Sequence, residues 1–199
     1  MATGAEATQG LEAVVLAAGA GRRFGGGKLL TPWNGAPLLH AALRAAFAAP
    51  VRGVTVATGS GAEAVAEAAR AFDSRVRIVH AAEHEEGIAA SLRTAIASLP
   101  PDSAGALVFL GDMPRVPHAV LRPLAEALQT ARAAAPVFDG RRGNPAALSS
   151  ALFPQLLDLK GDQGARAVLD ALGPDLALIE APDDGVLFDV DRPGDLAQS

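Results

Sequence analysis

A glycine-rich segment over residues 16–28, L-A-A-G-A-G-R-R-F-G-G-G-K, combines the residue types that phosphate chemistry needs. Glycine lets backbone N–H groups approach a phosphate chain closely, and cationic side chains neutralise its charge. Arg23 and Lys28 supply that charge here. A solvated surface loop is the plain alternative, but the segment concentrates cations directly after an apolar run in an acidic protein. The segment therefore predicts a polyphosphate site.

Two common phosphate-binding patterns do not fit this segment. The dinucleotide fingerprint G-x-G-x-x-G needs glycine at position 24, where the chain has Phe24. No Asp or Glu occurs in residues 53–60 to bind a ribose. The P-loop needs Ser or Thr after its Gly-Lys pair and a glycine five residues before that pair, but the chain has Leu29 and Arg22 at those positions.

Acidic residues downstream could complete such a site with a metal ion. Asp112 follows an apolar run in G-D-M-P, and a carboxylate at a strand end can bind Mg²⁺. Asp191 and Asp189 lie in F-D-V-D-R-P-G-D-L, two residues apart, so on a strand they would share a face. We expect Asp112 and Asp191 to hold the metal. His80 and His84 match no metal-binding pattern and are expected to be surface residues.

Apolar runs alternate with helix-like stretches, which predicts an α/β framework for these residues. Strands are expected over residues 12–18, 53–58, 75–80, 104–110, 133–137, 145–148, 176–180 and 186–190. Helices are expected over residues 37–49, 62–72, 87–99, 117–130, 149–157 and 163–172. The alternation over the first 130 residues predicts a mostly parallel sheet whose strand ends form the ligand-binding rim.

Composition restricts the class of protein. The 199 residues suffice for one domain, expected over residues 11–199 after a disordered tail over 1–10. A net charge of −5 gives no reason to expect nucleic-acid binding. The absence of cysteine excludes disulfides, thiolate metal sites and Cys nucleophiles. No signal-like segment occurs, nor a run of ~18 apolar residues that could span a membrane, so we expect a cytoplasmic protein with no membrane partner.

The pattern L-A-A-G-x-G-x-R-x-G-x-x-K resembles the signature of nucleotidyltransferases that make nucleoside-diphosphate-linked products. The matching residues are Gly19, Gly21, Arg23, Gly25 and Lys28. Arg22 stands at a variable position of that signature and is expected to be solvated. The segment around Asp191 is similar to the family's closing D-x-D-x-P-x-D-L pattern, whose second Asp is the usual metal ligand.

Three further segments resemble the molybdenum cofactor cytidylyltransferases within this family. E-G-I-A-A-S-L matches a segment that lies against the nucleotide, with Ser91 as its polar residue. R-R-G-N-P resembles an R-G-x-P loop, although Asn144 stands where the family usually has His. G-D-Q-G-A-R resembles a stretch facing the pterin substrate. Without that role, Asp162 could cap a helix and Arg166 could pair with it at i+4.

The resemblance implies a Rossmann-like, three-layer α/β/α fold with a mixed, mostly parallel sheet. It implies transfer of CMP from CTP to the terminal phosphate of the molybdopterin cofactor, with Mg²⁺ as cofactor and a molybdenum hydroxylase as a candidate client. The implied catalytic residues are Arg23, Lys28 and Asp112. The implied nucleotide-binding residues are Leu16, Ala17, Ala18, Gly19, Gly21, Arg23, Lys28, Thr58, Ser91 and Asp112. The implied acceptor-binding residues are Asn144, Pro145, Asp162 and Arg166.

The opening L-A-A-G, rather than L-A-G-G, favours CTP over GTP by analogy. Three alternatives stay open: a guanylyltransferase, a sugar- or polyol-phosphate cytidylyltransferase, and a non-catalytic factor that helps mature a molybdenum hydroxylase.

Overall fold

The computed structural model describes residues 10–198 of the chain. The expected tail falls outside these residues except for Gly10, whose carbonyl accepts a hydrogen bond from the Ala104 N–H at 2.9 Å. The main sheet has the strand order β10-β7-β9-β6-β1-β4-β5, with β8 paired to β7. Its strands are β1 (Leu11–Ala17), β4 (Val54–Thr58), β5 (Arg77–His80), β6 (Gly105–Leu110), β7 (Ala133–Phe138), β8 (Arg141–Arg142), β9 (Ala146–Ser149) and β10 (Leu176–Glu180).

The sheet is mixed but mostly parallel. β1 pairs in parallel with β4 and β6, β4 with β5, and β7 with β10. β9 runs antiparallel to both β6 and β7, and β8 runs antiparallel to β7. A small second sheet pairs β2 (Pro32–Trp33) with β3 (Ala36–Pro37). The expected fold class is therefore confirmed.

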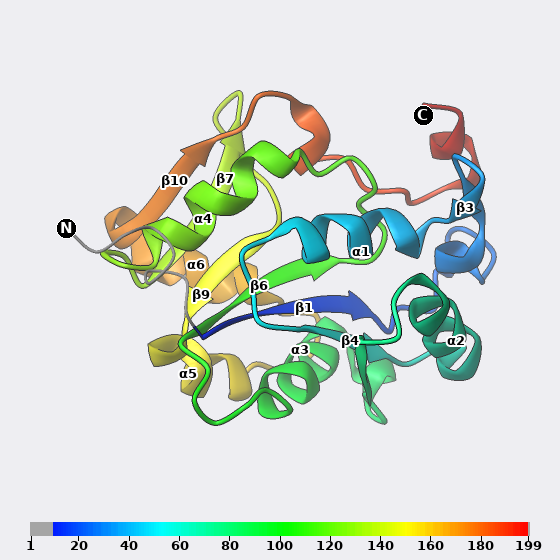
Figure 1. Cartoon of the computed structure of the whole chain (residues 1–199), viewed down its shortest axis with the longest axis horizontal. Helices are drawn as coiled ribbons and strands as arrows, with labels where there is room; N and C mark the ends of the chain where they lie inside the picture. Colours follow the sequence, from blue (N-terminus) through cyan, green and yellow to red (C-terminus); the bar gives the residue numbers. More distant parts are fainter. Residues whose placement is uncertain (1–9, 199) are drawn as a thin grey trace.

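Helices cover both faces of the sheet. One layer contains α1 (Leu39–Ala48), α2 (Ala62–Phe72) and α4 (Leu121–Ala127), and the other contains α3 (Ile88–Ala97), α5 (Phe153–Leu157) and α6 (Ala165–Leu172). In Figure 1, α1 and α4 lie on the opposite side of the sheet from α3 and α5. None of the helices in the described part of the chain is long and apolar enough to cross a membrane.

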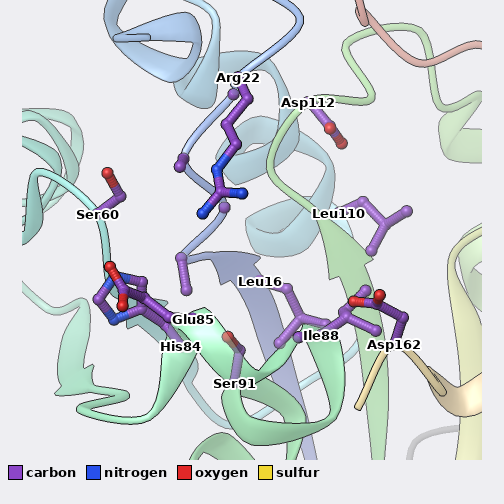
Figure 2. A pocket seen from close by; sticks show the side chains of 15 residues that line it. Leu16, Arg22, Ser60, His84, Glu85, Ile88, Ser91, Leu110, Asp112 and Asp162 are labelled. Atoms are coloured by element: carbon purple, nitrogen blue, oxygen red, sulfur yellow. The ribbon is translucent and has the colours of Figure 1, made fainter.

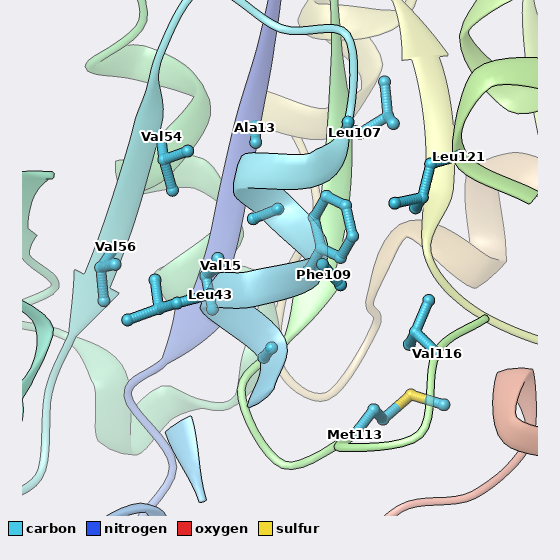
Figure 3. Packing of buried hydrophobic residues seen from close by; sticks show 14 of the residues in the cluster. Ala13, Val15, Leu43, Val54, Val56, Leu107, Phe109, Met113, Val116 and Leu121 are labelled. Carbon is cyan, nitrogen blue, oxygen red and sulfur yellow. The ribbon is translucent and has the colours of Figure 1, made fainter. Parts of the chain in front are cut away.

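Strand β1 explains why both faces must be covered. Its residues are apolar almost without interruption, as in strands buried on both sides. Ala13 and Val15 face the layer of α1, whereas Val14 belongs to the cluster around α3. Figure 3 shows the first of these clusters, in which Leu43 of α1 and Phe109 of β6 lie against β1. With few aromatic residues in the chain, small alanines let α1 approach the sheet closely.

Two element predictions were wrong. The helix expected over residues 117–130 is shorter and covers only Leu121–Ala127, after a 3-10 turn over His118–Val120. Pro123 lies in its first turn, where the missing N–H of proline is tolerated. The strand expected over residues 186–190 does not form. Val186 and Val190 are buried in the core instead, Leu187 and Phe188 are half-buried, and the segment is joined to the fold by single hydrogen bonds to neighbouring loops.

The remaining predicted elements are found with small shifts at their ends. Their order creates a switch point at β1, because the chain proceeds from β1 to β4 on one side and later returns to form β6 on the other. In open parallel sheets, ligands bind beyond the carboxyl ends of strands at such a point. The glycine-rich loop leaves β1 at this position.

Candidate functional site

The glycine-rich loop folds back on itself so that its end returns to its start. Gly21 has φ +57, and a Cβ there would lie 3.2 Å from the Lys28 Cβ. The Phe24 N–H donates to the Gly21 carbonyl at 2.9 Å, which closes a turn. Phe24 then packs against a small apolar cluster and anchors the loop. A glycine at position 21 thus allows both the left-handed backbone and the close approach of Lys28.

Lys28 lies between two of the predicted carboxylates. Its Nζ is 2.7 Å from Asp112 Oδ2 and 3.9 Å from Asp191 Oδ1. The Lys28 side chain is only 12% exposed, so water screens these contacts weakly. Arg23 donates to Asp191 Oδ2 at 2.8 Å. These contacts join residues that are separated by 84 and by 168 positions in the sequence into one charged cluster.

The C-terminal segment holds Asp191 beside Asp112 by its backbone. The Val190 N–H donates to the Asp112 carbonyl at 3.0 Å, and the Val190 side chain is fully buried. The Asp195 carboxylate accepts hydrogen bonds from the N–H groups of Asp191 and Arg192 at 2.9 and 2.7 Å. The bond from Arg192, followed by that from Asp191, lowers the pKa of Asp195 below its ordinary value. Asp195 therefore orders the backbone that carries Asp191.

A third carboxylate, Asp189, lies near the same cluster. Partial removal from water raises the pKa of Asp189, and the negative charges of Asp112 and Asp191 raise it further. Lys28 opposes this shift. The cluster is therefore rich in negative charge even though two cations already pair within it.

A cavity of about 460 Å³ opens beside the glycine-rich loop (Figure 2). Six of the predicted nucleotide-binding residues line it: Leu16, Ala18, Gly19, Gly21, Ser91 and Asp112. Ala17 and Thr58 are buried instead, and the Thr58 hydroxyl donates to the Val79 carbonyl at 3.2 Å. Arg23 and Lys28 are not among the lining residues, although Lys28 borders a smaller adjoining cavity.

Four polar side chains that were not predicted to belong to the site also line this cavity: Arg22, Ser60, His84 and Glu85. Ser60 is held in place because its N–H donates to the Ala18 carbonyl at 3.1 Å. His84 begins a 3-10 turn, and its Nδ1 lies 3.0 Å from the Ala81 carbonyl. The sequence offered no signal for Ser60 and His84, since both follow strand ends in unremarkable loops. Their position depends on how β4 and β5 lie beside β1.

A second cavity of about 260 Å³ adjoins the first. The two share the lining residues Leu16, Ile88, Leu110 and Asp162. Asn144 and Arg166, which were predicted to bind an acceptor, line the second cavity, whereas Pro145 does not. Gly87, which lines the first cavity, packs closely beside Asp162, because it has φ +118 and a Cβ there would collide with the Gly161 carbonyl and with the Asp162 carboxylate.

Helix capping does not explain the G-D-Q-G-A-R stretch. Helix α6 begins at Ala165 with Gly164 as its N-cap residue and without a side-chain cap. Arg166 lies 3.9 Å from Asp170 and is not paired with Asp162. Asp170 also pairs with Arg142, which lines the second cavity. Asp162 is left free to face both cavities, and Arg142 is a second cation there that the R-R-G-N-P motif could have indicated.

Comparison with known proteins agrees with this geometry. Residues 13–176 match the MobA-like NTP transferase domain. The chain belongs to this family. It is therefore a nucleotidyltransferase of the MobA-like type, and the cavity beside the glycine-rich loop lies within the matched domain.

Two relatives match this MobA-like transferase over most of its length, and a third matches about half of it. It is 31% identical over 188 residues to the purine catabolism protein PucB of Bacillus subtilis, covering 90% of this chain and 91% of PucB. Rv0371c from Mycobacterium tuberculosis H37Rv superposes with a TM-score of 0.81 at 31% identity, covering 94% of this chain and 96% of that one. Identity reaches 44% over 103 residues with the bifunctional protein GlmU of Cereibacter sphaeroides, but this chain spans only 22% of GlmU's length.

The residues of the cluster fit a divalent cation that binds together with a nucleotide. The Lys28 ammonium already lies where the Asp112 and Asp191 carboxylates converge, so this point accepts positive charge. Within residues 10–198, no group of three or more His, Cys, Asp or Glu side chains is arranged to hold a metal by itself. Mg²⁺ prefers one or two carboxylates completed by phosphate oxygens and water, which matches two carboxylates at the rim of a cavity. A structure of Rv0371c in complex with manganese superposes with a TM-score of 0.77 at 27% identity.

Proposed function

We propose that this nucleotidyltransferase transfers CMP from CTP to the terminal phosphate of the molybdopterin cofactor. A phosphate oxygen of the acceptor would attack the α-phosphorus of CTP. The bond from that phosphorus to the bridging oxygen would break, and pyrophosphate would leave. The observation that carries the proposal is the meeting of two cavities at Asp162, with the carboxylate cluster at the rim of the first. Two substrates that must react with each other need two such sites side by side.

The first cavity suits a nucleoside triphosphate. Gly19 and Gly21 expose backbone along one wall, where N–H groups can approach phosphates. Ser91 lies on the first turns of α3 and contributes a hydroxyl from the facing wall. The attacking phosphate oxygen is already anionic, so no general base is required. The protein's task is alignment and charge neutralisation.

The charged cluster would perform that neutralisation. Asp112 and Asp191 would hold Mg²⁺, which offsets the negative charge of the phosphates when bound. Lys28, which forms an ion pair with Asp112 in this structure, would supply positive charge to the departing pyrophosphate. Arg23 would keep Asp191 in position through its hydrogen bond and add positive charge to the same place.

The second cavity suits the acceptor. Arg142 and Arg166 offer positive charge there, and Asn144 offers an amide at a position where related enzymes usually have histidine. Asp162 faces both cavities, where a carboxylate can accept hydrogen bonds from the amino groups of a pterin ring. PucB, whose name connects it with purine catabolism, is a relative over nearly the whole chain. The likeness to GlmU covers only about half of this chain, so it gives weak support to the alternative of a sugar-phosphate acceptor.

The test is a nucleotide panel with Mg²⁺ and the purified molybdopterin cofactor, read by pyrophosphate release and mass spectrometry of the product. We expect kcat/KM for CTP to exceed that for GTP by roughly tenfold or more, the discrimination available from a change of one methyl group in a binding site. A GTP preference would indicate the guanylyl branch. Turnover only with a sugar or polyol phosphate would show that this phosphate, and not the molybdopterin cofactor, is the acceptor. An absence of pyrophosphate with every pair of nucleotide and acceptor would favour a non-catalytic maturation factor.

A further inference from the structure

The three cations of the glycine-rich loop have different surroundings. Lys28 pairs with Asp112, and Arg23 pairs with Asp191. Arg22 has no acidic partner among residues 10–198 and is exposed. Two of the three charges are therefore already balanced by carboxylates of the protein, and one is not.

The direction of each side chain follows from how the loop is anchored. Phe24 packs on the apolar cluster that also contains Val190, so the residue before it, Arg23, lies beside Asp191. Arg22 leaves the loop on the other side. Figure 2 shows its guanidinium reaching into the cavity between Ser60 and Asp112.

Within the first cavity, Arg22 is the only lysine or arginine among the lining residues, whereas Glu85, Asp112 and Asp162 are acidic. A triphosphate entering this cavity would meet negative side chains on several sides. Backbone N–H groups and a metal ion would offset part of its charge, but a terminal phosphate beyond the metal needs a further donor. A guanidinium offers a planar set of donors that matches two phosphate oxygens at once.

We propose that Arg22 binds the β- and γ-phosphates of the nucleoside triphosphate, whereas Arg23 serves mainly to hold Asp191. This inference rests on the proposed function for its ligand, but it concerns binding alone and needs no acceptor. It reverses the expectation from the family signature, in which Arg22 occupies a variable position. Among residues 10–198 the Arg22 side chain has no hydrogen-bond or ion-pair partner, and only its backbone carbonyl accepts a hydrogen bond within the loop, from the Gly25 N–H, so we expect truncation of the side chain to leave the fold unchanged.

The experiment measures the binding of CTP and CMP, each with Mg²⁺, by isothermal titration calorimetry. Arg22→Ala should weaken CTP binding by roughly tenfold to a hundredfold, the loss expected for hydrogen bonds between charged groups. CMP lacks the β- and γ-phosphates, so its affinity should change by less than about twofold. Arg22→Lys should recover only part of the loss, because an ammonium cannot form the bidentate contact.

The matched control is Arg132→Ala, which removes the same charge from an exposed residue just before β7 that lines neither cavity. It should bind both nucleotides like the wild type. Tripolyphosphate is the second ligand, because it tests the phosphate contact without a base, and its affinity should fall in Arg22→Ala even if CTP is not the natural nucleotide. Unchanged CTP and tripolyphosphate binding in Arg22→Ala would overturn the inference, as would an equal loss for CTP and CMP. Failure of the proposed function would appear separately, as wild-type protein that binds these ligands yet releases no pyrophosphate.

Discussion

Replacing Lys28 by methionine tests whether a placed cation drives the proposed reaction. The substitution keeps an unbranched side chain only one atom shorter and removes its charge. In the resting protein, it deletes a 2.7 Å ion pair between side chains that are 12% and 25% exposed. Hydrogen bonds to charged groups contribute about 1.5–3 kcal/mol each, and a loss of similar size is expected in the transition state, where charge develops on the leaving pyrophosphate. A loss of about 2.7 kcal/mol corresponds to a roughly 10²-fold decrease in kcat.

The same substitution should lower kcat without raising the Mg²⁺ concentration that the reaction requires. Lys28 lies between Asp112 and Asp191, so it competes with any cation for their oxygens. The methionine variant should therefore require no more Mg²⁺ than the wild type for half-maximal rate, although its kcat is far lower. A lower kcat with an unchanged or lower Mg²⁺ requirement distinguishes a catalytic cation from one that only supports the fold.

The assay is pyrophosphate release at saturating nucleotide and acceptor over a series of Mg²⁺ concentrations. Lys160→Met is the matched control, because Lys160 is the only other lysine of the chain, is exposed and lines neither cavity. That variant should keep wild-type kcat. A kcat for Lys28→Met within about threefold of wild type, with only KM raised, would refute the reasoning, since it would mean that Lys28 contributes equally to ground state and transition state.

Three further predictions concern the support of the site and of the fold. Asp195→Ala removes the acceptor for the Asp191 N–H. It should raise the Mg²⁺ concentration for half-maximal rate by roughly tenfold, the typical effect of losing a group that orients a metal ligand. An unchanged Mg²⁺ requirement would show that Asp191 is held in place without Asp195. Glu12→Ala should lower the free energy of unfolding by about 2–3 kcal/mol in urea titrations. The buried Glu12 carboxylate accepts hydrogen bonds from Arg52 and Arg77, which can partly rehydrate when it is lost. A free energy of unfolding equal to that of the wild type within experimental error would contradict this. Hydrogen bonds from Arg75 lower the pKa of Asp73 from 3.8 to about 2, so their stabilising effect is present above pH 3.8 and is lost as the pH falls through about 2. The stability difference between the wild type and Asp73→Ala should follow that course in acid titrations, and a pH-independent difference would refute the assignment.

The sequence by itself determined the local structure on which the site is built. The run of β1, apolar except for Glu12, dictates a strand buried on both faces, and the glycines that follow dictate a turn with left-handed backbone. Both are decided by a few neighbouring residues. The fold class follows from the alternation of such runs with amphipathic helices, and the structure confirms it.

Local patterns failed where distant packing decides the conformation. Residues 186–190 have the composition of a strand, but they pair with none of the strands described between residues 10 and 198, and Val190 packs in the cluster with Trp33 and Leu38 instead. The segment is held by the bond from its Val190 N–H to the Asp112 carbonyl. A strand needs a partner as well as suitable residues, and the partner is not encoded within the segment.

The roles of Arg22 and Arg23 show the same limit at the level of single residues. The two are adjacent and identical in type, so no local pattern can say which one faces a ligand. The structure separates them because Phe24 packs beside Val190, which brings Arg23 to Asp191 and leaves Arg22 to the cavity. The sequence determined that cations would follow β1. Only the tertiary packing decided which of them is already paired with a carboxylate and which is free to bind another anion, because ion pairs form between groups that the fold brings together across 84 and 168 residues.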